Sequence, residues 1–140
     1  MKESMSNDHW KAYRATTYWV KDRDQHFCIR IGEASEDLEQ LLTAHDSTNW
    51  AYITASNPRS EMLTAEENAA RNDQLMDHVK QAGRLHFRGE GIGNDPTWPP
   101  EASILIVGMD KDEALELGRE FGQNAIVIGR KGQAAELVDC

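Results

Sequence analysis

The polar residues best placed to do chemistry lie in one stretch, ITASNPRSEMLTAEENAARN, residues 53–72. A strand-like run there enters an Asn-Pro turn and leaves through the start of a helix. The apolar line of that helix, through Leu75 and Val79, continues backwards to Asn72 and Asn68. A buried amide costs free energy unless it is hydrogen-bonded, so the two amides either tie down the turn at 54–63 or line a cleft. Both interpretations stay open at this point.

Two neighbouring residues favour a ligand with negative charge. Arg71 lies beside the two amides, and a guanidinium can hold a carboxylate or phosphate through two hydrogen bonds. Asn57 ends a strand and precedes a helix, a location that ligands favour in sheets with helical crossovers. Pro58 predicts a turn with extended backbone at Asn57. The nearby helix start offers free amides, so a small anionic or nucleotide-like ligand is expected.

The second candidate segment is the long loop at residues 89–101, within RGEGIGNDPTWPPEAS, which we expect to act as a lid over the cleft. It supplies the carboxylates of Glu90, Asp95 and Glu101 and the apolar plate of Trp98. Its glycines are not followed by Gly-Lys-Ser/Thr or by a helix, which argues against a phosphate loop or a dinucleotide fingerprint.

Glu67 has a structural explanation. With Thr64 it spells a T-x-x-E capping box at a helix start, and Asp110 with Glu113 predicts a second one. In a cleft, any of Glu67, Glu90 and Glu101 could instead act as acid or base.

No metal, cofactor or nucleophile is predicted. The five histidines do not form H-x-x-x-H or H-E-x-x-H spacing, and no G-x-S-x-G motif is present. Cofactor and catalytic residues therefore stay open.

Composition narrows the class of protein. The chain has 140 residues and a formal net charge of −9, which argues against binding to a phosphate backbone. No apolar run approaches the length of a membrane span, and the N-terminus lacks the apolar region of a signal peptide. A cytoplasmic protein without membrane contact is therefore expected.

Hydrophobic periodicity predicts one α+β domain over residues 13–140, after a flexible lead-in at 1–12. About three helices and a mixed sheet are expected, in the order ββαβαββαβ(β). From residue 50 onward this order is that of the split unit of a ferredoxin-like core. The predicted strands cover 13–20, 26–32, 50–56, 85–91, 103–109, 124–130 and 134–139, and the predicted helices cover 35–46, 65–82 and 111–121.

Several spaced segments together carry a resemblance to a known family. They are ITASNP, EENAARNDQL, GEGIGNDPTWPPEASILIVGM and EALELGREFGQNAIVI. Over about residues 13–138 the chain resembles the bacterial family catalogued as domain of unknown function 3293. The resemblance implies a compact stand-alone domain and no particular chemistry.

Two functions compete. The first is a small-molecule binding protein or enzyme, with a cleft between the 54–72 strand-turn-helix and the 89–101 loop. Its expected site residues are Asn57, Asn68, Arg71, Asn72, Glu90, Trp98 and Glu101. The second is a module for protein interaction or homodimerisation, anchored by the aromatic side chains of Tyr13, Trp19, Trp50 and Trp98.

Overall fold

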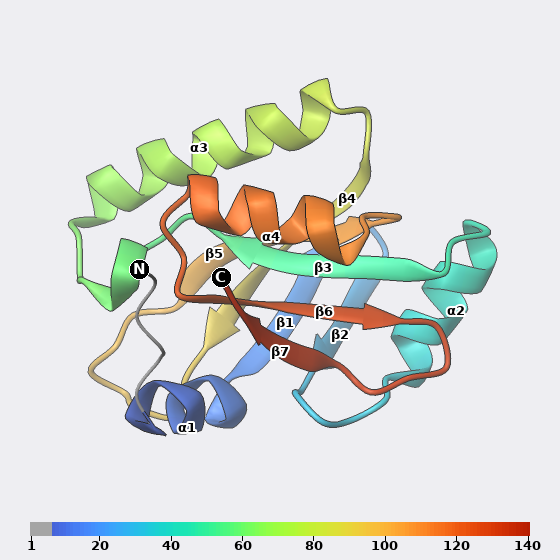
Figure 1. Ribbon diagram of the computed structural model, residues 1–140, viewed down its shortest axis with the longest axis horizontal. Coiled ribbons are helices and arrows are strands. Elements are labelled where there is room, and N and C mark those ends of the chain that lie inside the picture. Colours follow the sequence, from blue (N-terminus) through green and yellow to red (C-terminus); the bar gives the residue numbers. More distant parts are fainter. Residues whose placement is uncertain (1–6) are drawn as a thin grey trace.

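The computed structural model describes residues 7–140, which form four α-helices, one short 3₁₀ turn and seven strands (Figure 1). The helices are α1 (Asn7–Ala15), α2 (Glu36–Ala44), α3 (Ala65–Gln81) and α4 (Lys111–Glu120), and the 3₁₀ turn η1 covers Pro58–Ser60. The strands are β1 (Thr17–Asp22), β2 (Gln25–Ile29), β3 (Asn49–Thr54), β4 (Leu85–Ile92), β5 (Glu101–Val107), β6 (Ala125–Arg130) and β7 (Glu136–Asp139).

All seven strands belong to one sheet, in the order β2-β1-β4-β5-β3-β6-β7. Every strand pair is antiparallel, so the expected mixed sheet is wrong. The connections through α3 and α4 each pass over one intervening strand. Strands joined by a helix are therefore separated by an antiparallel neighbour, which is the split arrangement expected from residue 50 onward.

The sheet curls until its two outer edges approach each other. Ile31, just after β2, forms an isolated parallel bridge with Ala135, just before β7. The amide of Gly32 donates to the carbonyl of Ala135 at 2.8 Å, and the Ala135 amide donates to the Glu33 carbonyl at 3.1 Å. The curl gives the sheet an enclosed inner face and an outer face.

The inner face holds one hydrophobic core, which α2 closes at one end (Figure 1). Leu38, Leu41 and Leu42 of α2 pack there against strand residues such as Trp50 and Phe87. As predicted, Ser35 caps α2 by accepting a hydrogen bond from the Leu38 amide. The end of the curled sheet that α2 covers is thus filled by apolar side chains.

The outer face carries a second core beneath α3 and α4. Leu75 and Val79 of α3 and Leu117 of α4 are buried against Ile53 and Ile106 of the sheet. The two helices contact β3, β5 and β6, so they leave β1 and β2 uncovered on this face.

The capping predictions hold with one exception. The reciprocal box between Thr64 and Glu67 at the start of α3 is confirmed. At the start of α4, Asp110 accepts from the Glu113 amide, but the Glu113 carboxylate pairs with Arg84 instead of returning to Asp110. An ion pair with Arg84 is the stronger partner for that carboxylate, so the second box is half formed.

The expected element order is wrong at its beginning. Residues 1–6 of the expected lead-in lie outside the described residues, but from Asn7 onward the chain forms α1. The first strand therefore begins at Thr17 and not at residue 13, and the described chain has four helices instead of about three. The sequence of α1 is mostly polar, and its apolar signal is confined to Trp10 and Tyr13, which are only partly buried against the inner core.

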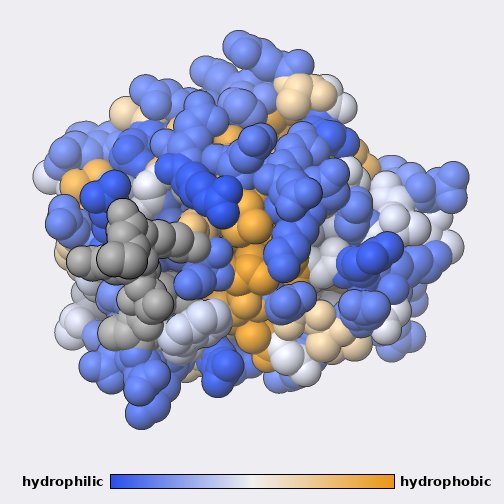
Figure 2. All heavy atoms as spheres, in the orientation of Figure 1, coloured by the Kyte–Doolittle hydropathy of each residue, from blue (hydrophilic) through white to orange (hydrophobic). Residues whose placement is uncertain are grey.

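The face drawn in Figure 2 is mostly hydrophilic, with one narrow apolar strip in its middle. Among residues 7–140, Met62 is the only large hydrophobic residue classed as exposed. None of the helices in this part of the chain is long and apolar enough to cross a membrane.

Gly89 of β4 permits a close contact across the inside of the curled sheet. The Tyr52 hydroxyl donates to the main-chain carbonyl of Trp19 at 2.7 Å, next to Gly89. A Cβ atom on Gly89 would lie 1.9 Å from that carbonyl oxygen and 2.9 Å from the tyrosine hydroxyl. A side chain at this position therefore forces β1 and β4 apart.

We predict that Gly89→Ala lowers the free energy of unfolding by about 1–3 kcal/mol, because the atom it meets is main chain and cannot rotate away. Gly91→Ala is the matched control on the same strand and face, where the added Cβ meets only ordinary contacts at 3.7 Å. Urea unfolding of both variants measures the difference. Equal stabilities would contradict the close packing at Gly89.

Candidate functional site

A cavity of about 310 Å³ lies at the end of the curled sheet opposite α2. It is bounded by α1, the 57–60 turn and the loop at 93–98, and its floor is the inner face of the sheet. Its polar lining residues are His9, Tyr13, Thr16, Tyr18, Tyr52, Thr54, Ser56, Asn57, Ser60, Asn94, Asp95, Trp98, Glu101, Ser103 and Gln123. Its volume is at the small end of the range for small-molecule sites.

Glu101 is the central polar residue of the cavity. One carboxylate oxygen, Oε2, accepts from Asn57 Nδ2 at 2.7 Å and from the Trp98 indole Nε1 at 3.1 Å. These bonds join three of the expected site residues, of which Asn57 and Glu101 are 44 residues apart in the sequence. The turn and the loop expected to form a cleft therefore do meet, at Glu101.

The turn that supplies Asn57 has unusual backbone geometry. Asn57 has φ 46° and ψ 63°, in the left-handed region, so the extended backbone expected before Pro58 is wrong. Its own side chain explains the difference, because Oδ1 accepts from the Leu63 amide at 2.9 Å and from Asn68 Nδ2 at 2.9 Å. Arg59 and Ser60 also have positive φ, at 56° and 61°. Backbone of this kind persists only where the surroundings hold it, and it is common at functional sites.

Asn68 and Asn72 of α3 hold this turn from behind and do not line the cavity. Asn68 Oδ1 accepts from the Asn57 amide at 2.8 Å. Asn72 accepts from the Ala55 amide at 2.9 Å and donates to the Ser56 hydroxyl at 2.8 Å. Their contacts are those of the structural interpretation, in which the two amides tie down the turn.

Arg71 also lies outside the lining. Its Nε donates to the Ala55 carbonyl at 2.7 Å, and its Nη2 donates to the Phe121 carbonyl. The guanidinium thus joins the end of β3 to the end of α4, and it is not directed at the cavity as an anion site would require.

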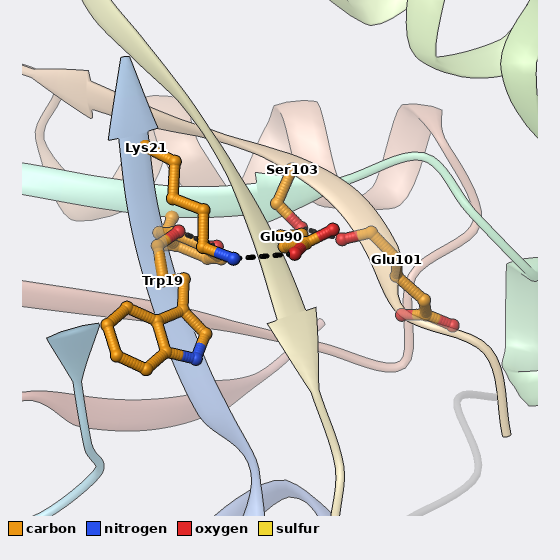
Figure 3. A network of polar contacts seen from close by, with 6 residues as sticks. Trp19, Lys21, Glu90, Glu101 and Ser103 are labelled. Atoms are coloured by element: carbon orange, nitrogen blue, oxygen red, sulfur yellow. Dashed lines mark hydrogen bonds and ion pairs between the residues drawn. The ribbon is translucent and has the colours of Figure 1, made fainter. Parts of the chain in front are cut away.

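Glu90 lies on the opposite face of the sheet from the cavity. It forms an ion pair with Lys21 at 2.8 Å, and Figure 3 shows the Glu101 carboxylate turned away from that pair. Side chains of successive strand residues point to opposite faces, so Gly89 and Gly91 face inward and Glu90 faces outward. Asp95, in contrast, lies at the exposed mouth of the cavity. Hydrogen bonds from the Thr97 side chain and amide hold the pKa of Asp95 below its usual value.

Sequence reasoning missed the tyrosines as cavity residues. Tyr13, Tyr18 and Tyr52 all line the cavity, and burial raises the pKa of each above the usual 10.0. Tyr18 donates to the Tyr13 carbonyl at 3.0 Å, which ties α1 to the sheet. Alternation along β1 and β3 could have placed Tyr18 and Tyr52 on one face, but the curl that encloses that face has no sequence signal.

The model of the family described as Protein of unknown function (DUF3293) matches residues 53–126, just over half of the chain. The chain belongs to this family. The matched range runs from β3 to β6 and includes Asn57, Trp98 and Glu101, whereas α1 and β1 lie outside it. Neither a curated protein nor a solved structure matches the chain.

Across residues 7–140 there is no cluster of three or more histidine, cysteine, aspartate or glutamate side chains that could hold a metal ion.

We predict that Asn68→Ala lowers the free energy of unfolding by about 1–3 kcal/mol, because it leaves the main-chain N–H of the buried Asn57 without its acceptor and removes one of the two donors to Asn57 Oδ1. Gln74→Ala, at an exposed position of the same helix, is the control and should change stability by less than about 0.5 kcal/mol. Chemical denaturation compares the two. A neutral Asn68→Ala would show that the turn does not need this support.

We further predict that alkaline pH unfolds the protein and ionises its tyrosines together. The chain has three tyrosines, all in the cavity wall, and each has its pKa raised in the folded state. Above pH 10 the unfolded chain loses these protons first, so stability is complete below pH 10 and falls as the pH rises further. Tyrosinate absorbance and circular dichroism should change in one coincident step. Tyrosinate that forms near pH 10 with the fold intact would contradict the burial of these hydroxyls.

Proposed function

We propose that this protein binds a small molecule in the cavity at the open end of its curled sheet, with Glu101 as the polar anchor. One observation carries the proposal: a carboxylate held in place by two neutral donors forms part of the wall of a cavity. Sites of this kind combine mostly apolar walls with a few well-placed polar groups. The mouth of a barrel-like sheet is a common place for them.

The mechanism of binding follows from how the anchor is built. Asn57 and Trp98 fix the direction of the Glu101 side chain before any ligand arrives, and Asn68 in turn fixes Asn57. A polar group positioned in advance loses little rotational freedom on binding. Asn68, Arg71 and Asn72 therefore support the site from the second layer, while Asn57, Trp98 and Glu101 face the ligand.

Space for the ligand comes from Gly91. It pairs with Glu101 in the β4–β5 ladder and faces the cavity without a side chain. A Cβ atom there would lie 3.7 Å from both Thr16 and Tyr18, so larger side chains would extend into the cavity.

We predict that Gly91→Val narrows the cavity beside Glu101, keeps the fold and strongly weakens ligand binding. Valine is favourable in strands, and its first atom meets no clash. The test is a thermal-shift screen of a small-molecule fragment library against wild type, with hits measured by calorimetry on the variant. Ala102→Val, on the exposed outer face of the neighbouring strand, is the control and should bind like wild type.

Two results would contradict this proposal. The first is a wild-type protein that binds no member of the library at millimolar concentration. The second is a set of hits whose affinities are the same for Gly91→Val as for wild type, because such ligands bind elsewhere.

Dimerisation is the second candidate function, favoured by the outer face of β1 and β2, which contributes no residue to the core beneath α3 and α4. Trp19 is partly exposed there, with its ring 5.5 Å from that of His26. The other expected anchors are used elsewhere: Trp50 is 1% exposed in the inner core, and Tyr13 and Trp98 line the cavity. Light scattering over a range of concentrations, with Trp19→Ala as the variant, tests this candidate.

A further inference from the structure

We infer that the ligand of this cavity carries a protonated nitrogen attached to an aromatic or apolar body. The inference rests on the proposed function and names its ligand class. It replaces the anionic ligand that Arg71 suggested, and it follows from the charges and surfaces of the described residues.

The negative charge of Glu101 is not balanced by a positive side chain of the described residues. Glu101 forms no ion pair with any lysine or arginine of the described chain, and its two partners, Asn57 and Trp98, are neutral. Both of them donate to Oε2, which leaves Oε1 without a hydrogen-bond partner among residues 7–140. A carboxylate in this situation favours a ligand that brings a positive charge and N–H donors.

The charged residues of the cavity lining also favour a cation over an anion. Asp95 adds a second carboxylate at the mouth, and none of the described lining residues is lysine or arginine. An anionic ligand would be repelled by these two carboxylates, and no lysine or arginine of the described lining would attract it. The net charge of −9 also attracts cations from a distance.

The rest of the cavity wall is aromatic and apolar. Tyr13, Tyr18, Tyr52 and Trp98 contribute aromatic rings, and Ala125, Val127 and Leu137 contribute apolar surface. Aromatic rings attract cations through their negative faces and also pack against apolar groups. Burial keeps the phenols neutral, since it raises their pKa, so these rings add no charge to the wall.

Gly91 lies opposite Glu101 in the strand pair, so β4 places no side chain beside the carboxylate, and the nearest side chains to this space are Thr16 and Tyr18. A small ammonium group fits that space, while the body of the ligand extends over the tyrosine rings.

The test uses three probes that share a phenyl body: 2-phenylethylamine, 2-phenylethanol and 3-phenylpropanoate. Their affinities are measured by calorimetry at pH 8, where the amine is protonated. We expect wild type to bind the amine roughly 10- to 100-fold more tightly than the alcohol, from a hydrogen bond to a charged group. The carboxylate should bind more weakly than the alcohol.

Glu101→Gln removes the charge but keeps the shape and an accepting oxygen, so Asn57 and Trp98 retain a partner. We expect this variant to lose the preference for the amine over the alcohol. Glu90→Gln removes the same charge from the outer face and should keep the preference, which separates the cavity from the general field of the protein. Circular dichroism and thermal melting verify that both variants are folded.

Three outcomes would overturn the inference. They are an amine that binds no better than the alcohol, an amine preference that survives Glu101→Gln, and an absence of binding by all three probes. The fragment screen with Gly91→Val then separates two failures. If neutral or anionic fragments bind in a manner that depends on Gly91, the proposed function stands and only the ligand class is wrong.

Discussion

The curl of the seven-stranded sheet is the constraint on which the rest of this structure depends. Because the segments at Ile31 and Ala135 meet, the inner face has no open side and can be closed only at its ends. At one end α2 supplies three leucines, which fill the space. At the other end the covering elements are α1, a turn and a loop, and together they leave a cavity. The site is thus the end of the inner core that apolar side chains do not fill.

The polar residues around that end divide into two layers with different physical roles. A left-handed turn needs its main-chain groups satisfied, and Asn57, Asn68 and Asn72 do this with short hydrogen bonds. The same turn positions the side-chain amide of Asn57 so that its Nδ2 donates to Glu101. Structural and functional interpretations of these residues are therefore not exclusive, because the scaffold of the turn is what orients the anchor.

Much of the fold could be predicted from the sequence, because local signals were strong. The helix starts were marked by capping residues, Ser35 and the pair Thr64 and Glu67, and the ends of α3 and α4 by the glycines that follow them. The alternation of apolar and polar residues marked most strands. α1 escaped prediction because most of its residues are polar and its two aromatic side chains, Trp10 and Tyr13, are only partly buried against the inner core. The mixed sheet was a wrong expectation because strand order and direction depend on which strands meet in space, and no single segment encodes this.

The candidate site was predicted in part for a similar reason. Asn57, Trp98 and Glu101 do come together, since a strand end and a long loop are common neighbours in sheets with crossovers. Arg71 was assigned to a ligand because guanidinium groups bind anions, whereas here it holds two main-chain carbonyls between β3 and α4. The sequence gives no sign that Glu90 and Glu101 differ. In the structure their side chains lie on opposite faces of the sheet, because side chains alternate along each strand.

Nuclear magnetic resonance of the tryptophan indole N–H groups during titration with 2-phenylethylamine tests the central claim most directly. The chain has four tryptophans, and the Trp98 indole donates to Glu101, while Trp19 lies on the outer face and Trp50 in the filled end of the core. A protonated amine that takes its place at Glu101 should shift the Trp98 signal in a saturable manner and leave the Trp19 and Trp50 signals unchanged. A Trp98 signal that does not move at saturating amine, or one that moves equally in Glu101→Gln, would contradict the account.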